Sequence, residues 1–462
     1  MQSHFDTICA IITPLGKGAV STLRISGKNA LETIAGHFSK PDKLRLAAGH
    51  SLTFGTFYSV NSEPLDEVLI AKFVAPRSYT GEDVLEISCH GNPLIANSIL
   101  ETLLTSIRLA EPGEFTRRAY LNGKLDLIQA EAVGDLIDAQ SSKSETSALL
   151  QLQGYLTKHL LELLEGIKHA RLRMELAIDF SDQDLPQIDL EQLETDLEKL
   201  HSRARNLYSD SKGGKYLREG IRVCLSGAPN VGKSSLFNAL LRENRAIVSP
   251  RPGTTRDYLE ESVSLEGYAM IVYDTAGLRN STDEIEMIGI SRTRELMESA
   301  DFVVELRELP EFLADPVSPT GNKHLLALTK IDTLGFDQLP TEDQWQDFLL
   351  SRGCPPEVRK PIPVSSVLAG GLNLLTAELI KRLSLPELRT DSPIITNTRQ
   401  LAALKETISC LEKALDALRN GLGFEFVAFD LIAGASALQQ ILGISTPDDL
   451  LGEIFSNFCV GK

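Results

Sequence analysis

Residues 221–241 read IRVCLSGAPNVGKSSLFNALL, and this stretch decides the fold of the middle of the chain. An apolar run typical of a strand leads into G-x-x-x-x-G-K-S, and a helical pattern follows at once. That is the context a phosphate-binding loop requires. In such a loop Gly227 and Gly232 let backbone amides wrap the phosphates. Lys233 reaches the terminal phosphates, and Ser234 can ligate magnesium. The stretch therefore predicts an α/β nucleotide-binding domain.

Two further segments of a nucleotide site follow in the expected order. GTTRD (253–257) offers Thr255 as a second magnesium ligand in a switch-like loop. DTAG (274–277) follows the strand-like run AMIVY. It places Asp274 beside the metal and the Gly277 amide near the terminal phosphate. These spacings predict a nucleoside triphosphate with its metal.

A further segment, LLALTKIDT, is expected to contact the base of the nucleotide. It contains Thr329, Lys330 and Asp332. A carboxylate at Asp332 can accept from the ring N–H and the exocyclic amine of guanine, a pattern that adenine does not offer. VSS (364–366) resembles the loop that closes over such a base. The combination predicts GTP as the nucleotide.

The group that would orient the attacking water is less evident. Leu278 occupies the position after the DTAG glycine, where many regulatory GTPases have Gln, and its side chain has no hydrogen-bonding group. Three carboxylates follow, and each could act through a bridging water or belong to a solvated loop: Asp283, Glu284 and Glu286. Asn230 in the phosphate loop could help to hold a monovalent cation in place of an arginine finger.

Composition limits the class of protein. The chain has 462 residues, a net charge of −17 and 42% hydrophobic residues, which indicates a soluble protein of several domains without general affinity for nucleic acid. It lacks an apolar run of about 18 residues and a secretion signal, so we expect no membrane span and no export. Six cysteines without paired spacing favour reduced thiols in the cytoplasm.

Two clusters of basic residues contrast with this acidic balance. One covers 203–222, and the other is GEFTRRAYLNGK (113–124), with Arg117, Arg118 and Lys124. Each cluster is either a solvated helix face or a focused set of phosphate contacts.

The pattern of segments predicts how the chain is organised. Residues 1–120 alternate strand-like runs with a helix and predict a small α/β domain. Residues 121–215 are helical, 216–384 alternate strands and helices, and 385–462 are helical again. We interpret the two helical regions as one discontinuous domain interrupted by an inserted P-loop GTPase domain with a mostly parallel, doubly wound sheet. Two separate helical domains, each with a thin core, are the alternative. In the first region we predict strands at 6–13, 20–27, 66–74 and 83–91 and a helix at 92–107.

The chain ends FSNFCVGK, directly behind a helix signal, STPDDLLGEIFSNF. Thr446 reads as the N-cap and Pro447 as a first-turn residue, followed by acidic residues at the positive end of the helix dipole. The apolar face of this helix predicts that it docks, so that the tail is fixed and presents Cys459 and Lys462. Taken alone, a cysteine so near a terminus is usually incidental.

Together these motifs resemble those of the MnmE (TrmE) family of tRNA modification GTPases. The resemblance rests on GAPNVGKSS, PGTTRD, DTAGLRNSTDEIEMIGI and the terminal FCVGK. TGEDVLEISCHG, RLAEPGEFTRRAYLNGKLDLIQAEAVGDLIDA and AIDF extend it through the N-terminal and helical regions. It therefore covers essentially the whole chain.

The resemblance implies a reaction and its participants. It implies a GTP hydrolase that helps to add a carboxymethylaminomethyl or aminomethyl group to carbon 5 of the wobble uridine of certain tRNAs. It also implies a homodimer that works with the FAD-dependent MnmG protein in a heterotetramer. The N-terminal domain would bind 5-formyl- or methylene-tetrahydrofolate, which supplies the one-carbon unit. Potassium and magnesium would serve GTP hydrolysis.

Carried onto this sequence, the resemblance assigns site residues. The catalytic residues would be Glu286 and Cys459. The folate contacts would be Arg24, Glu86, Lys124 and Lys462. Potassium would be held by Asn230, Ser249, Arg251 and Thr254, with the loop 249–254 folding over the ion, and magnesium by Ser234 and Thr255. The GTP contacts would be Gly227, Asn230, Val231, Gly232, Lys233, Ser234, Ser235, Thr254, Thr255, Asp274, Gly277, Lys330, Asp332 and Ser365.

Two positions depart from the family pattern. Thr329 stands where the guanine motif usually has Asn, and Ser366 stands where a small Ala is usual beneath the base. A threonine hydroxyl makes fewer contacts than an amide, so we expect weaker guanine binding with the discrimination by Asp332 intact. The alternative functions are a ribosome-assembly or regulatory GTPase without modification chemistry, and a nucleotide-gated scaffold.

Overall fold

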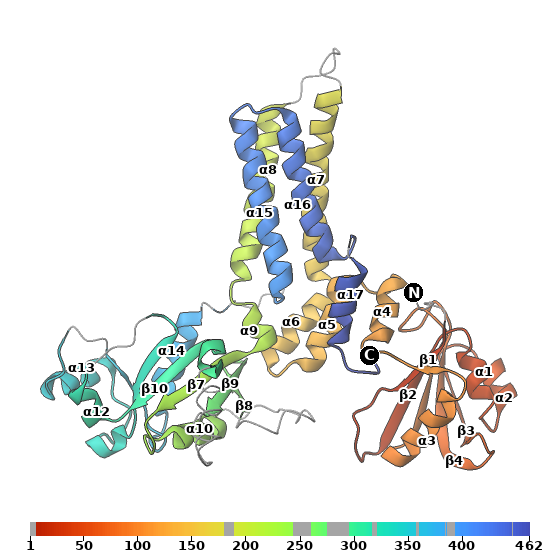
Figure 1. The fold of residues 1–462 in the computed structure, drawn as a ribbon, viewed down its shortest axis with the longest axis horizontal. Helices are drawn as coiled ribbons and strands as arrows, with labels where there is room; N and C mark the ends of the chain where they lie inside the picture. Colours follow the sequence, from red (N-terminus) through yellow and green to blue (C-terminus); the bar gives the residue numbers. More distant parts are fainter. Residues whose placement is uncertain are drawn as a thin grey trace. The chain divides into compact units, whose positions relative to one another are not determined.

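The chain folds into two compact units, each described here by itself (Figure 1). The computed structural model describes residues 6–179, 189–243, 260–274, 295–316, 321–356, 360–383, 385, 393–445 and 447–462. The terminal unit comprises Met1–Gly134, Gln151–Leu197 and Cys410–Lys462. The central unit comprises Asp135–Leu150 and Glu198–Ser409.

A six-stranded mixed sheet forms the first part of the terminal unit. Its strands lie in the order β3 (Ser51–Tyr58), β4 (Pro64–Phe73), β5 (Val84–His90), β2 (Val20–Ser26), β1 (Ile8–Ile11) and β6 (Arg108–Leu109). Neighbouring strands are antiparallel except β1 and β6, which are parallel. The helices of this part are α1 (Ala30–Ala35), α2 (Pro41–Leu46) and α3 (Pro93–Leu104). The strands and the helix that we predicted for this region are confirmed.

The alternation of side chains along the strands separates a core face from an opposite face that carries charged side chains. Leu23 and Ile25 of β2 and Ile87 of β5 are fully buried among the core residues. Arg24 and Glu86 occupy the alternate positions and lie opposite each other in the β2–β5 register. Because successive side chains of a strand point to opposite faces, both charged groups lie on the face away from that core.

Helices make up the rest of the terminal unit. They are α4 (Glu114–Leu121), the first part of α5 (Leu127–Asp138), α7 (Tyr155–Asp179), α16 (Phe424–Leu442) and α17 (Asp448–Ser456). The helices α8 (Leu190–Asp210) and α15 (Thr398–Arg419) run from one unit into the other. Helices α7 and α16 pack along each other (Figure 1). By length and composition α16 could cross a membrane, but half of it is buried inside the protein, as in a core helix.

A second six-stranded sheet forms the central unit. Its order is β12 (Ile362–Pro363), β11 (His324–Leu328), β10 (Phe302–Arg307), β7 (Ile221–Gly227), β9 (Tyr268–Asp274) and β8 (Glu260–Leu265). All neighbours are parallel except β8 and β9, so the predicted mostly parallel sheet is confirmed. The helical elements of this unit include α6 (Ser142–Leu152), α9 (Lys215–Glu219), α10 (Lys233–Glu243), α12 (Leu309–Ala314), η2 (Ile331–Leu334), α13 (Glu342–Ser351) and α14 (Asn373–Leu383).

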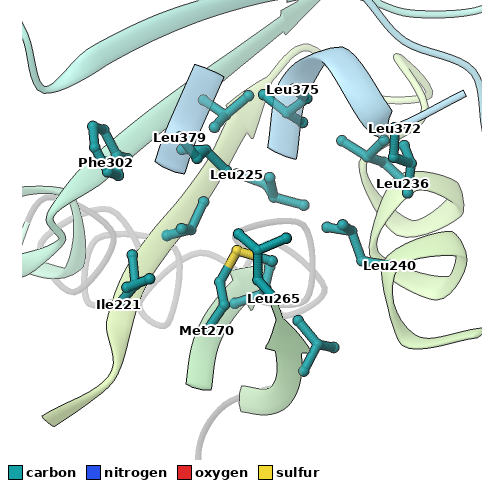
Figure 2. Packing of buried hydrophobic residues seen from close by; sticks show 14 of the residues in the cluster. Ile221, Leu225, Leu236, Leu240, Leu265, Met270, Phe302, Leu372, Leu375 and Leu379 are labelled. Atoms are coloured by element: carbon teal, nitrogen blue, oxygen red, sulfur yellow. The ribbon is translucent and has the colours of Figure 1, made fainter. Parts of the chain in front are cut away.

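The core beneath the nucleotide motifs is apolar and closely packed. Leu225 and Ile221 of β7 meet Leu236 and Leu240 of α10 in one cluster, and Met270 of β9 joins them (Figure 2). Complete burial of such side chains is worth about 1.5–3 kcal/mol each. The strand and the helix that flank the phosphate loop are therefore held by burial on both sides of it.

The C-terminal helix begins one residue later than predicted. Pro447 is the N-cap of α17, with ψ of 145°, and the helix starts at Asp448. Thr446, which we predicted as the N-cap, lies outside the described residues. The extended backbone of Pro447 places it before the helix rather than in its first turn. Asp448 and Asp449 do lie in the first turn, as predicted.

Candidate functional site

The phosphate loop turns tightly between β7 and α10. Gly227 has φ of 143° and ends β7 opposite Leu306 of β10, and a Cβ built on Gly227 would collide with the Leu306 carbonyl oxygen. Asn230 has φ of 62° and Gly232 has φ of 106°, so both adopt the left-handed backbone that such a loop requires. Any residue larger than glycine at 227 would push β10 away.

Lys233 lies inside the loop that it is expected to serve. Its Nζ donates to the carbonyl oxygens of Gly227 at 2.9 Å and Ala228 at 2.7 Å, and the side chain is buried. An ammonium group has three donors and can turn from carbonyl to phosphate oxygens. Lys233 is also the first residue of α10, whose N-terminal amides favour an anion. The arrangement can bind the terminal phosphates of a nucleotide.

The predicted metal residues in the described chain gather at one edge of the sheet. Ser234 is exposed in the first turn of α10, directly after the loop, and Ser235 follows it. Asp274 is the last residue of β9 and pairs with Leu225 of the parallel neighbour β7. The carboxyl ends of parallel strands meet at the same edge, as a magnesium site would need. The other nucleotide and ion residues predicted lie outside the described residues: Ser249, Arg251, Thr254, Thr255, Gly277 and Glu286.

Thr329, the departure in the guanine motif, connects that motif to the phosphate loop. Its Oγ1 donates to the Val231 carbonyl oxygen at 2.6 Å, and both residues are buried. The next residue, Lys330, has φ of 59°, and its Nζ pairs with Glu308 at 2.5 Å. A single hydroxyl therefore joins the two loops. This bond could not be predicted from the sequence, because the two residues are 98 positions apart.

The carboxylate predicted to recognise guanine is held in place by the loop that contains Ser365. Ser365 is buried and its Oγ donates to Asp332 Oδ1 at 2.7 Å. The same Oγ accepts from the backbone N–H groups of Val367 at 3.1 Å and Leu368 at 3.2 Å. Those two donors fix the hydroxyl orientation, so that its proton points at Asp332. Ser366, the second departure, is exposed.

The terminal unit has a separate group of predicted residues. Arg24 Nε donates to Glu86 Oε1 at 2.9 Å, and the two side chains are 18% and 24% exposed. The Arg24 guanidinium lies 4.9 Å from the centre of the Tyr79 ring and 5.6 Å from that of Phe115. Burial raises the pKa of Tyr79, so its hydroxyl stays protonated. The pair offers a donor and an acceptor beside the half-buried ring of Tyr79, whereas the ring of Phe115 is fully buried.

Lys124 lies beside the loop that carries Tyr79. Its Nζ donates to the carbonyl oxygen of Pro76 at 3.1 Å. A Cβ built on Gly81 would lie 3.3 Å from Lys124 Cγ, so the lysine stem covers that glycine. Gly81 has φ of 80°, a conformation that favours glycine. Lys124 is therefore fixed along the stem, and its ammonium is near the surface.

The C-terminal tail is docked, as predicted. Val460 forms a bridge with Pro112, and the Phe115 N–H donates to the Lys462 carbonyl oxygen at 3.0 Å. Gly461 has φ of 101°, and a Cβ there would lie 2.6 Å from the Ile11 carbonyl oxygen. Cys459 remains exposed. Phe115 thus contacts both the Arg24 side chain, through its ring, and the backbone of Lys462, through its N–H.

In the basic cluster of residues 113–124, the central residue Arg118 is neither on a solvated helix face nor a phosphate contact, the two roles predicted for it. Arg118 is buried, and its guanidinium pairs with Asp6 at 2.8 Å, Glu114 at 2.8 Å and Glu82 at 3.1 Å. Arg108 also pairs with Asp6 and Glu114. Although burial alone would raise it, hydrogen bonds from the two arginines hold the pKa of the Asp6 carboxyl below its usual range. This cluster anchors α4, so Arg118 is neither a solvated residue nor a phosphate contact.

The second basic cluster is largely paired as well. Lys215 lies 3.1 Å from Asp301, and Arg218 lies 2.8 Å from Asp135. Both pairs tie α9 to its neighbours within the central unit. The sequence showed the charges but not these partners.

Two family models and several named relatives match this chain. The model of the TrmE N-terminus, described as a GTP-binding protein, matches residues 7–124, and that of the MnmE helical domain matches 127–459. The tRNA modification GTPase MnmE of Moorella thermoacetica is 40% identical over 470 residues, with 99% of each chain covered. Those of Desulfitobacterium hafniense and Aquifex aeolicus are 38% and 36% identical, over 99% of this chain and 100% of theirs. The chain, with its phosphate loop, its fixed Asp332 carboxylate and its docked tail, therefore belongs to the MnmE family of tRNA modification GTPases.

Proposed function

We propose that this protein hydrolyses GTP to drive the modification of carbon 5 of the wobble uridine in certain tRNAs. The observation that carries the GTP part is the Ser365–Asp332 hydrogen bond of 2.7 Å, in the same unit as the closed loop around Lys233. The alternative of a GTPase without modification chemistry is less favoured. It gives no role to the docked tail beside Arg24 and Phe115.

The roles in the nucleotide site follow from the chemistry of each group. Lys233 and the amides around Gly232 would bind the β- and γ-phosphates, and Asp332 would accept from guanine. Magnesium would be held by Ser234 and Thr255, hydroxyl oxygens that suit a hard cation. When bound, it neutralises charge that develops on the phosphate oxygens. The Thr329 bond to the phosphate loop keeps the base and phosphate parts in register.

Hydrolysis needs a group that positions water and a positive charge near the transferred phosphate. Leu278 supplies neither. We therefore propose that Glu286 orients the attacking water, acting through a second, bridging water molecule. We assign potassium to Asn230, Ser249, Arg251 and Thr254. The left-handed backbone of Asn230, with φ of 62°, supports its place in this set because it turns the residue within the loop. Potassium would supply the charge that an arginine finger supplies elsewhere.

The cation assignment predicts a difference between two salts. Steady-state GTP hydrolysis should be faster in potassium chloride than in sodium chloride at equal ionic strength, by about 10-fold or more, since stabilising transition-state charge is worth several kcal/mol. The measurement is phosphate release by the full chain, with magnesium constant. Equal rates in both salts would remove potassium and Asn230 from the mechanism and leave the nucleotide assignment standing.

The water assignment predicts a separation of binding from turnover. Glu286→Ala should lower the rate of hydrolysis about 10²–10⁴-fold, the usual contribution of a positioned acid or base, while GTP affinity persists. Single-turnover hydrolysis and equilibrium binding of a fluorescent GTP analogue measure the two quantities. Glu284→Ala, two residues away, is the matched control and should hydrolyse GTP normally. Unchanged turnover in Glu286→Ala would contradict the role.

We propose that the terminal unit binds a tetrahydrofolate derivative. A folate has a flat pterin with N–H donors and an anionic glutamate tail. Glu86 can accept from the pterin, the ring of Tyr79 can lie against it, and Lys124 and Lys462 can pair with the tail. When bound, 5-formyl- or methylene-tetrahydrofolate supplies the one-carbon unit. Arg24 orients Glu86, and the tail presents Cys459 toward the same surface.

The partners follow from this reaction. We propose a homodimer in the cytoplasm that works with an FAD-dependent MnmG protein in a heterotetramer and takes tRNA as its substrate. The support is the membership of the MnmE family over the whole chain, since the modification reaction needs an oxidation–reduction step for which the family relies on FAD.

A further inference from the structure

Helix α16 is apolar on its solvent-facing side as well as on the side that faces the core. Val427, Leu431 and Leu438 are fully buried, as a core helix requires. Phe426 and Phe429, in contrast, are 63% and 71% exposed. A helix on the surface of a globular protein keeps its outer side polar, and a helix that is apolar all round is normally covered on every side. The composition of α16 is therefore that of a helix with a partner on both sides.

The exposed apolar residues form a row along the first half of α16. Leu422, just before the helix, and Ile432 are 53% and 46% exposed, and they extend the row of Phe426 and Phe429 at spacings of three and four residues. Ser436, at the next position of the same row, is exposed and polar. We call Leu422, Phe426, Phe429 and Ile432 the outer row. Its limited length indicates a local contact rather than burial of the whole helix.

The adjoining end of α7 adds two leucines. Helices α7 and α16 pack along each other, and α7 ends where α16 begins (Figure 1). Leu172 and Leu176, one turn apart near the end of α7, are 51% and 48% exposed. Two helices of the terminal unit thus expose large apolar side chains at the same end. Exposed apolar side chains gathered in this way mark a site of interaction with a protein or a membrane.

The charges at this end of the two helices are unbalanced. Helix α16 contains Glu425 and Asp430 and no Lys or Arg. Within the part of the chain that the structure describes, neither carboxylate has an ion-pair partner. The basic residues near the end of α7 are already paired, Arg171 with Glu175 and Arg173 with Asp196. The unpaired charges beside the outer row are therefore negative.

This negative charge disfavours two of the possible partners. A second copy of this chain would bring the same carboxylates together, and the chain as a whole has a net charge of −17. The anionic surface of a bilayer attracts Lys and Arg beside an apolar helix face, and α16 has neither. A protein helix with its own apolar row and with basic residues on the flanks suits both the apolar and the charged side chains.

We propose that the outer row of α16 binds an amphipathic helix of a partner protein, in which Lys or Arg flanks the apolar row. The rings of Phe426 and Phe429 are buried against the apolar side chains of the partner, since buried aromatic residues carry most of the binding energy in such contacts. Glu425 and Asp430 pair with the basic residues of the partner. The surface lies within the terminal unit, and the proposal does not depend on the assignment of GTP or of folate.

Two synthetic helical peptides test this proposal on the full chain by fluorescence anisotropy. Both carry leucine at helical spacing, and their other positions are lysine in one peptide and glutamate in the other. We expect the lysine peptide to bind, and the variant Phe426→Ser with Phe429→Ser to bind it about 10-fold or more weakly. That variant keeps the net charge of the chain, so undiminished binding would reveal general electrostatic attraction and overturn the proposal. A lysine peptide that does not bind the unaltered chain would overturn it as well.

A charge exchange tests the flanks of the row separately. Glu425→Lys with Asp430→Lys should weaken the lysine peptide and allow the glutamate peptide to bind. Leu46→Ser, at a leucine of α2 that is 87% exposed, is the matched control and should bind the lysine peptide as the unaltered chain does. Thermal unfolding of each variant checks that the fold is retained. An unchanged preference for the lysine peptide after the charge exchange would contradict the assigned roles of the two carboxylates.

Two further measurements detect the other partners. Sedimentation of the unaltered chain and of the Phe426→Ser, Phe429→Ser variant shows whether the outer row joins two copies. Flotation with vesicles of phosphatidylcholine and phosphatidylserine shows whether it binds a membrane. Loss of self-association in the variant, or vesicle binding that the variant abolishes, would assign the outer row to that partner and overturn the proposal.

Discussion

Asp332→Asn should change the preferred nucleotide from GTP to xanthosine triphosphate. In the proposed site the carboxylate accepts from the ring N–H and the exocyclic amine of guanine, and the amide of Asn would meet that amine with a donor. In xanthine the amine is replaced by a carbonyl oxygen, which the amide can bind. Two hydrogen bonds to a charged group are worth about 1.5–3 kcal/mol each, so we expect GTP affinity to fall about 10²–10⁴-fold. Competition titrations of both triphosphates measure the change.

The substitution is well suited to test recognition rather than folding. Ser365 still finds an acceptor in the side-chain oxygen of Asn, so the closing loop keeps its 2.7 Å contact. Asp337→Asn, at an exposed carboxylate five positions along the chain, is the matched control and should leave both affinities unchanged. A variant that still prefers GTP would show that the base is recognised by other groups.

Deletion of residues 459–462 should abolish tRNA modification and leave GTP hydrolysis intact. It removes Cys459 and Lys462 and the backbone contacts that hold the tail to Pro112 and Phe115. A positioned acid, base or nucleophile contributes about 10²–10⁴ to a rate, so the modified uridine should fall below detection. None of the deleted residues belongs to the nucleotide-binding sheet. Mass spectrometry of tRNA nucleosides and phosphate release measure the two activities.

Point substitutions distinguish the loss of the tail's side chains from the loss of its backbone contacts. Val460→Ala retains the bridge to Pro112 and is the control, since that side chain is 47% exposed. Lys462→Ala and Cys459→Ser then distinguish folate binding from chemistry. Modification that survives the four-residue deletion would refute the role of the tail.

The nucleotide site could be predicted because the residues that form its phosphate loop are close together in the sequence. The glycines of the phosphate loop, Lys233 and Ser234 lie within eight positions of chain, and the strand before them and the helix after them follow from the same stretch. Backbone geometry confirms the need for glycine at 227 and 232. Spacing alone was enough there, since a phosphate is bound mainly by consecutive amides.

Other features could not be predicted, either because the interacting residues are far apart in the sequence or because the apolar side chains of a strand face outward. Arg118 donates to the backbone of Asp6, 112 positions away, and a sequence shows only that it is basic. Strand β3 was missed because Leu52 and Phe54 face outward, whereas Thr53 and Gly55 are buried. A side chain at Gly55 would collide with the ring of Phe38 at 2.6 Å, so the inner face there has no room for an apolar residue.

The ion cluster of Asp6, Glu82, Arg108, Glu114 and Arg118, in which Glu114 and Arg118 are buried, has a consequence for how the sequence diverges in evolution. Removing one partner from a buried ion pair costs about 3–5 kcal/mol, because a charge is left without compensation, whereas exchanging the whole set for apolar residues can be neutral. Single-step substitution at Glu114 or Arg118, the two buried members, therefore passes through an unstable intermediate sequence. The members should persist or disappear as a group, and lineages that lost them should have replaced the first turn of α4 at the same time.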